Sequence, residues 1–382
     1  MRRTFPSVVF TLMWTVSAVA FGGGGCAKPG AKTIPVGEYG SLTGGTATFG
    51  QSSHQGTMLA TEEVNAAGGL LGQKVEVITE DDQSRPEEAK TAVLKLIKQN
   101  NVVAVIGEVA SSRSLAAAPE CQKSKIPMIS PASTNPKVTE IGDYIFRACF
   151  VDTFQGEAMA KFARNDLKLS RVAVLKDVKN DYSVGLADFF EKTFKAEGGE
   201  ITVVQSYSEG DIDFRAQLTA IKGQSPDGVF VPGYYTEVGL IARQARELGI
   251  TVPLMGGDGW DSPKTIEIGG AAVEGSYFGN HYAADDPDPV IQSFIQKFKA
   301  KYGIVPDAMA VLGYDAASLL YDAIKRAGSA EPAKIRDALA ATADFQGVSG
   351  KLTMDANRNA KKKLVIMKIE NGANKFHAEV KP

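Results

Sequence analysis

Residues 102–106 read Val-Val-Ala-Val-Ile and run directly into Gly107. A continuous β-branched run of this kind is expected of a strand that helices cover on both faces, as in a parallel sheet. A helical pattern follows from about Ser112 to Lys123. The run therefore predicts one strand–helix unit of an α/β protein.

The same alternation extends in both directions along the chain. Residues 34–39 predict a strand and 51–67 a helix, and a strand pattern over 74–79 is followed by Ser84-Arg85-Pro86-Glu87, which has the spacing of a helix capping box. Beyond Phe150 the rhythm restarts, with strand patterns at 172–175, 201–204, 229–231 and 252–255 and helical patterns at 184–196, 214–222, 237–248, 290–302 and 309–327. The tail predicts short antiparallel strands at 351–354, 364–370 and 375–380. We therefore expect two doubly wound parallel sheets of similar build.

Composition limits the class of protein. The chain has 382 residues, of which 44% are hydrophobic and 23% charged, enough for two globular domains. Its 42 Lys and Arg against 44 Asp and Glu include no basic block for phosphates, so no nucleic-acid partner is expected. Three scattered histidines (His54, His281, His377) and the absence of a CxxC pair predict no metal site and no cofactor.

The common enzyme signatures are missing. The glycine-rich residues 40–46 lack the lysine of a phosphate-binding loop, and there is no G-x-S-x-G elbow. Residues 355–359 imitate the start of a calcium loop, but Ala360 replaces its turn glycine and Ile366 its bidentate glutamate. We expect a polar turn there, and a protein that is not an enzyme.

The first 25 residues predict an export signal. Arg2 and Arg3 precede an apolar run over 8–21, with two competing cleavage points after it. Ala18-Val19-Ala20 is an A-x-A site, whereas Gly23-Gly24-Gly25-Cys26 resembles a lipobox with glycine in place of the usual aliphatic residue. We favour a periplasmic protein with a lipid anchor on Cys26 and a tether over 26–33. Cys121 and Cys149 are compatible with either a disulfide or two buried thiols.

Polar and aromatic residues follow the predicted strands. In open α/β sheets ligands bind beyond the carboxyl ends of strands, which selects Ser111, the loop Ser130–Pro136, Tyr182, Tyr234 and Asp258. Each has a plainer alternative: a helix cap for Ser111, an ordinary turn for the loop, packing for the tyrosines and an Asx-turn for Asp258. Hydroxyls at a helix N-terminus for an anion, a carboxylate for a cation and aromatic rings for an apolar body together match a zwitterionic amino acid.

The chain resembles the branched-chain amino-acid binding protein family of ABC importers over nearly all of its expected mature length. The segments that carry the resemblance are Ile106–Ser112, Pro127–Pro136, Phe154–Gly156, Gly233–Glu237 and Gly256–Asp258.

This resemblance implies a type I periplasmic-binding fold, with two lobes joined by crossovers near Val151, His281 and Gly350. The lobes would comprise residues 34–151 plus 282–350 and 152–281 plus 351–382. By similarity, Ser111 and Thr134 bind the ligand carboxylate, and Asp258 and the Ala132 carbonyl bind the ammonium. The expected pocket walls are Phe49, Tyr182, Tyr234, Trp260 and Tyr314.

The implied function is capture of an aliphatic amino acid by hinge closure and delivery to an ABC permease, by a chain expected to act as a monomer. The family usually has Glu where this chain has Asp258, a carboxylate with a shorter reach, so the preferred amino acid stays open. The alternative is a sensor for an amide, a urea-like compound or an aromatic acid. Asp258 favours an α-ammonium, because a neutral amide would leave that acid unmatched.

Overall fold

The computed structural model describes residues 33–381, together with Met1. The expected signal, Cys26 and nearly all of the tether lie outside this range. Thr33, the last residue of the expected tether, is instead the first residue of the first strand. Within the described residues, no helix is both long enough and apolar enough to cross a membrane.

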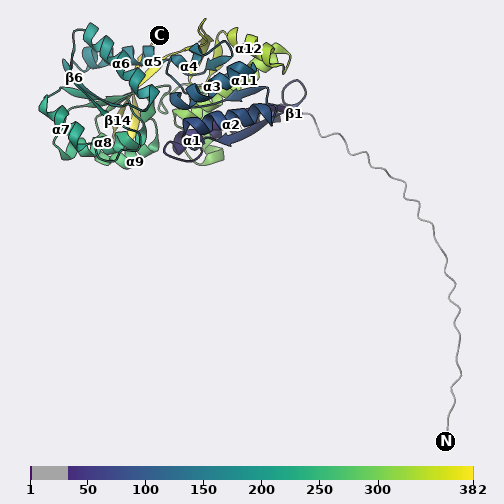
Figure 1. Cartoon of the computed structure of the whole chain (residues 1–382), viewed down its shortest axis with the longest axis horizontal. Helices are drawn as coiled ribbons and strands as arrows, with labels where there is room; N and C mark the ends of the chain where they lie inside the picture. Colours follow the sequence, from purple (N-terminus) through teal and green to yellow (C-terminus); the bar gives the residue numbers. More distant parts are fainter. Residues whose placement is uncertain (2–32, 382) are drawn as a thin grey trace. The chain divides into compact units, whose positions relative to one another are not determined.

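Two separate sheets organise the described chain (Figure 1). The first is fully parallel, in the order β2-β1-β3-β4-β5. Its strands are β1 (Thr33–Gly40), β2 (Lys74–Asp81), β3 (Ala104–Ile106), β4 (Met128–Ser130) and β5 (Ile145–Arg147). The run at 102–106 is thus its central strand, two residues shorter than predicted and completely buried.

The second sheet has the order β15-β14-β10-β9-β8-β6-β7. Its strands are β6 (Arg171–Asp177), β7 (Glu200–Tyr207), β8 (Gly228–Phe230), β9 (Leu254–Gly256), β10 (Tyr277–Asn280), β14 (Leu364–Glu370) and β15 (Ala373–Val380). The first five are parallel, and β14 and β15 join them antiparallel, as predicted for the tail. A small third sheet contains β11 (Phe345–Gly347), β12 (Gly350–Met354) and β13 (Ala360–Lys361).

Helices cover both large sheets. The helices that belong with the first sheet are α1 (Ala47–Ala66), α2 (Pro86–Lys98), α3 (Ser111–Ser124), α4 (Lys137–Glu140), α10 (Pro289–Tyr302), α11 (Ala308–Ala327) and α12 (Pro332–Ala340). The helices that belong with the second sheet are α5 (Asp152–Lys161), α6 (Asp181–Ala196), α7 (Arg215–Gly223), α8 (Tyr235–Glu247) and α9 (Pro263–Gly269). A π-helical turn η1 (Phe162–Asp166) follows α5, and short 3₁₀ turns are η2 (Asp258–Trp260) and η3 (Gly270–Val273).

One predicted helix start is wrong in detail. Ser84 does not cap α2, because its backbone is left-handed and its hydroxyl is used elsewhere, donating to Thr43 O at 2.8 Å. Arg85 occupies the N-cap position with no side-chain cap, and Pro86 opens the helix, where its missing N–H costs nothing. Ser84 therefore belongs to a loop that faces the second half of the molecule.

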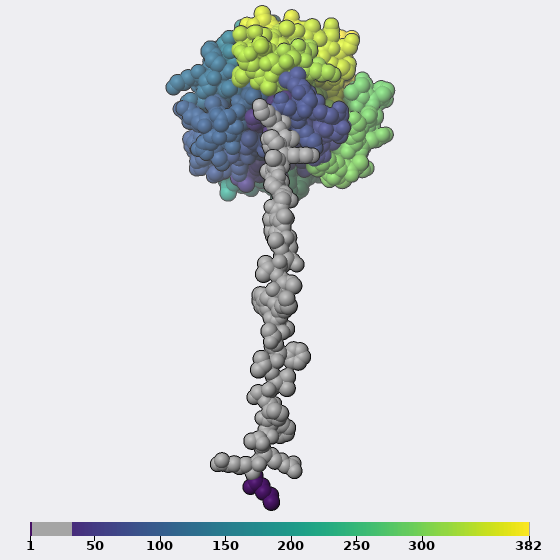
Figure 2. All heavy atoms as spheres, turned by 90° about the vertical axis from the view of Figure 1, so that its right-hand side faces the viewer, coloured from purple at the N-terminus to yellow at the C-terminus, as the bar shows by residue number. Residues whose placement is uncertain are grey.

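The chain passes between the two large sheets three times: after β5, after β10 and before β14. We expected the last passage near Gly350, but Leu352, Met354 and Ala360 pack in the core of the first sheet together with Ile34. The passage therefore comes shortly before Leu364. Figure 2 shows blue, green and yellow-green segments side by side at the end of the first lobe, which is thus assembled from distant parts of the chain.

Candidate functional site

A small enclosed cavity lies where the carboxyl ends of the strands in the two sheets face each other. Its lining atoms leave about 220 Å³ of unfilled space, which includes space open to solvent. Seven of the nine expected binding or wall residues line it: Phe49, Ser111, Ala132, Thr134, Tyr182, Tyr234 and Asp258. Val109, Gly259 and Met309 complete the lining. The site therefore fits a small molecule that contacts both lobes.

The first-lobe side of the cavity suits an anion. Ser111 is the first residue of α3, and its predecessor Ala110 provides no side-chain cap for the N-terminal N–H groups. Ser111 is therefore not the cap that the plainer alternative supposed. Its Oγ instead accepts from Asn135 N at 3.2 Å. The free end of a helix with hydroxyls beside it favours a carboxylate.

The buried Arg147 holds the loop that contains Thr134 through hydrogen bonds to its backbone carbonyls. Arg147 Nη1 donates to Ser133 O at 2.5 Å and its Nη2 to Asn135 O at 2.8 Å. The buried Thr134 Oγ1 has no hydrogen-bond partner among the described residues. An unpaired buried hydroxyl costs free energy, so this atom is available to a ligand.

The second-lobe side presents one fixed carboxylate. Asp258 follows β9 in the glycine-rich turn and is 3% exposed. Gln155 Nε2 lies 3.0 Å from its Oδ1, and His281 Nε2 lies 3.0 Å from its Oδ2. Burial lowers the pKa of His281 to about 4, so this partner is uncharged at neutral pH.

A second carboxyl group, Asp152, lies close by. Gln155 Nε2 also donates to Asp152 Oδ1 at 3.0 Å. Burial, and secondarily the neighbouring Asp258, raises the pKa of Asp152 to about 8. Asp152 is therefore largely protonated at neutral pH, and of the two side chains only Asp258 lines the cavity.

Aromatic rings close the cavity on its remaining side. Tyr182 and Tyr234 stack with centroids 5.4 Å apart, and Phe49 from the first lobe meets Tyr234 edge-on at 5.4 Å. Tyr182 OH accepts from Gly259 N at 3.2 Å. A Cβ at Gly259 would lie 2.7 Å from Gly233 O and 2.8 Å from the Tyr234 ring, so only glycine fits there.

Two expected wall residues lie elsewhere. Trp260 is buried beneath the turn in the core of the second sheet, where its Nε1 donates to Val231 O at 2.9 Å. Tyr314 faces a different pocket, and its OH donates to Glu63 Oε2 at 2.6 Å. Both predictions were wrong because proximity along the sequence, or the family resemblance, does not fix which way a side chain points.

Sequence reasoning also missed residues that matter here. In the sequence His281 is one of three scattered histidines, and Gln155 is notable only as part of a segment that carries the family resemblance. No sequence spacing links Gln155 to Asp258, since 103 residues separate them. The position of His281 directly after β10 was the available signal, because strand ends meet at this edge.

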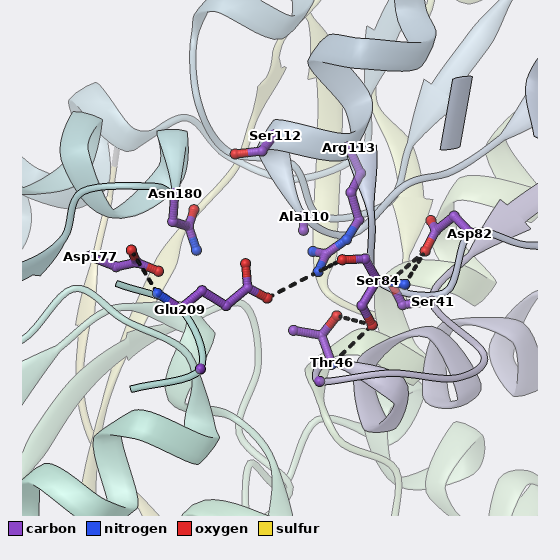
Figure 3. A network of polar contacts seen from close by, with 12 residues as sticks. Ser41, Thr46, Asp82, Ser84, Ala110, Ser112, Arg113, Asp177, Asn180 and Glu209 are labelled. Carbon is purple, nitrogen blue, oxygen red and sulfur yellow. Dashed lines mark hydrogen bonds and ion pairs between the residues drawn. The ribbon is translucent and has the colours of Figure 1, made fainter. Parts of the chain in front are cut away.

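A polar network joins the two lobes beside the cavity (Figure 3). The buried Arg113 of α3 donates from Nη2 to Ser84 O at 2.9 Å and to Glu209 Oε1 of the other lobe at 3.4 Å. Glu209 N in turn donates to Asp177 Oδ1 at 3.1 Å. Ser112 Oγ adds a second contact across the lobes, to Asp181 Oδ2 at 2.8 Å. The structure thus holds the lobes together around the cavity.

The remaining chemistry is sparse. Among the described residues, no three His, Cys, Asp or Glu side chains come together as a metal site would require. Cys121 and Cys149 are buried free thiols, which resolves the alternative left open by the sequence.

Comparisons with known proteins agree with this geometry. Residues 33–374 match the family described as periplasmic binding protein. The leucine-, isoleucine-, valine-, threonine- and alanine-binding protein of Pseudomonas aeruginosa is 32% identical over 346 residues, 90% of this chain and 92% of that protein. The chain therefore belongs to the periplasmic binding protein family, and its fold is the type I fold of two lobes joined by three crossovers.

Two solved structures are similar over their whole length. The leucine-binding protein LivK of Thermotoga maritima is 43% identical, with a TM-score of 0.89 over 92% of this chain and 99% of that one. The branched-chain amino acid transporter substrate-binding protein LivJ of Streptococcus pneumoniae, solved with isoleucine, is 35% identical, with a TM-score of 0.86 over 92% and 100%.

Proposed function

We propose that the protein is an extracytoplasmic receptor that captures an aliphatic, branched-chain amino acid and delivers it to an ABC permease. One observation carries the proposal: the cavity brings a helix N-terminus with two hydroxyls and a fixed carboxylate to the same small space. These groups complement the two charges of a zwitterion, and either charge left unpaired would be costly.

Each end of the ligand has assigned partners in this proposal. Ser111 and Thr134 bind the carboxylate, and Asp258 with the Ala132 carbonyl binds the ammonium. The side chain lies among Phe49, Tyr182 and Tyr234, and the small volume favours a compact aliphatic group. The names of the similar proteins, which record binding of leucine, isoleucine and valine, support this choice.

The available binding energy is sufficient. A leucine-sized ligand of about nine heavy atoms gains at most about 13 kcal/mol at the ceiling for very small ligands. Micromolar capture requires only about 8 kcal/mol. A small, nearly enclosed site therefore meets the demand without any covalent step, and we propose no enzymatic activity.

Hinge closure completes the proposed cycle. Residues 33–151 with 282–361 form one lobe and 362–381 join 152–281 in the other, and the ligand drives closure by contacting both. The permease recognises the closed form. The receptor acts in the periplasm as a monomer, held to the membrane by a lipid on Cys26.

Calorimetric titration tests the ligand class. Protein that has been unfolded, stripped of ligand and refolded is titrated with the standard amino acids, with short amides and with benzoates. Micromolar binding of leucine, isoleucine or valine supports the proposal. Binding confined to amides or benzoates refutes it and favours the sensor alternative.

Mass spectrometry of the mature N-terminus tests the anchor. A diacylglyceryl-modified peptide that begins at Cys26 supports lipidation. A peptide that begins at Phe21 shows cleavage after Ala20 and refutes it.

A further inference from the structure

Both oxygens of the Asp258 carboxylate are occupied by donors from two different elements. Gln155 lies on α5, the helix that follows the first passage between the sheets, and His281 follows β10 directly. Both donors lie 3.0 Å from their oxygen and are buried. The carboxylate is therefore fixed from two directions by the protein's own side chains.

Only one tautomer of His281 can donate a hydrogen bond to Asp258. A carboxylate oxygen only accepts, so the ring proton lies on Nε2, and the buried Nδ1 has no partner in the described part of the chain. Phe150 stacks on the ring with centroids 3.8 Å apart and planes 19° apart, which fixes its orientation. Burial, with a smaller contribution from Lys362, keeps the imidazole uncharged.

The glutamine amide is equally fixed. Its Oε1 accepts from Asp258 N at 2.8 Å, so its Nε2 must face the two carboxyl groups. Two glycines make room for it, because Cβ atoms at Gly257 and Gly279 would lie 2.8 and 3.2 Å from Oε1. One side chain thus holds both the backbone and the carboxylate of Asp258.

These partners share one chemical property: neither carries a charge. An arginine or lysine in either place would neutralise Asp258 and compete with a ligand ammonium. Uncharged donors hold the carboxylate still while its charge remains available. Among the described residues, no lysine or arginine lies within ion-pair distance of Asp258.

We propose that Gln155 and His281 are positioning residues that aim an uncompensated Asp258 carboxylate at the α-ammonium of the ligand. The inference rests on the proposed function and deepens it, because it identifies what holds the shorter acid in place. Neither residue needs to contact the ligand, and neither lines the cavity.

Four variants test the inference, with leucine affinity measured by calorimetry and folding checked by thermal melting. His281→Leu removes the donor, whereas His281→Gln provides an amide N–H near the position of Nε2. Gln155→Glu keeps the acceptor oxygen but turns a second carboxylate toward Asp258. His54→Leu is the matched control, since it breaks a histidine–carboxylate pair, with Glu38 at 2.6 Å, outside the cavity.

We expect His281→Leu and Gln155→Glu to raise the Kd for leucine about 10- to 100-fold. His281→Gln should stay within about fivefold of the parent, and His54→Leu within about twofold. A purely structural role would not distinguish Gln from Leu at position 281 in proteins that melt alike. If His281→Leu does not fold, the contrast between His281→Gln and Gln155→Glu decides the question.

The inference is overturned if His281→Leu or Gln155→Glu binds leucine within about threefold of the parent, or if His281→Gln loses as much as His281→Leu. A parent protein that binds no aliphatic amino acid instead refutes the proposed function. The two failures are therefore distinguishable by the parent titration alone.

Discussion

Replacing Asp258 by asparagine removes the negative charge while keeping the shape of the side chain. The protein should still fold, because the new Oδ1 can accept from Gln155 and the new Nδ2 can donate to Nε2 of the other histidine tautomer. Burial of Asp258 at 3% exposure leaves no water to compensate a ligand ammonium. Breaking a buried pair of this kind costs about 3–5 kcal/mol.

That cost corresponds to a roughly 100- to 4,000-fold rise in the Kd for leucine. Calorimetry or competition against a fluorescent ligand covers this range. The melting temperature should stay near that of the parent, because the asparagine can keep the hydrogen bonds to Gln155 and His281. Ser111→Ala serves as a comparison with a smaller expected loss, because it removes a neutral hydroxyl from the other end of the site. A Kd for Asp258→Asn within threefold of the parent would refute the assignment of the ammonium.

Three other perturbations have defined outcomes. Glu209→Ala removes the ion pair with Arg113 across the lobes and should raise the Kd two- to fivefold through faster dissociation, the scale of about 0.5–1 kcal/mol for a partly exposed pair; stopped-flow release of ligand measures it, and Glu200→Ala, which breaks a pair within one lobe, should leave the rate unchanged. Asp152 binds a proton in the folded state between its ordinary pKa and about 8, so its contribution to the free energy of unfolding falls as pH rises through that window; Asp152→Asn should melt higher than the parent at pH 8 and show a flatter pH dependence, and an unchanged profile would contradict the assignment. The two described cysteines should stay unlabelled by a thiol reagent in the native protein and react on unfolding, because both are completely buried and burial raises their pKa values, as peptide mapping can verify.

Strand and helix periodicity predicted the two doubly wound sheets, because most elements have a buried face with its own pattern, whereas the three crossovers were implied only by the family resemblance. The tail strand β14 was predicted with its observed bounds, Leu364–Glu370. Local chemistry was less reliable: Ser84 has the spacing of a helix cap, yet its hydroxyl bonds a loop 41 residues away. Such a choice depends on tertiary neighbours that a local pattern does not contain.

The site likewise contains residues that the sequence could predict and residues that it could not. Ser111, Tyr182, Tyr234 and Asp258 could be chosen because they follow strand ends, a position set by topology. The same argument selected the loop that contains Thr134, and the family resemblance then selected Thr134 within it. Gln155 could not be chosen, since no sequence spacing links it to Asp258, whereas the position of His281 directly after β10 was a usable signal. Trp260 shows the opposite case. It lies two positions after Asp258, but its side chain is buried in the core of the second sheet and not in the cavity.

The three passages between the sheets restrict how the two lobes can move apart. A single linker would permit twisting and sliding, whereas three connections fixed at both ends restrict the relative motion of the lobes. A cut in one connection leaves the lobes joined by the other two. Proteolytic cleavage of one connection should therefore make the relative motion of the lobes less restricted without separating the lobes.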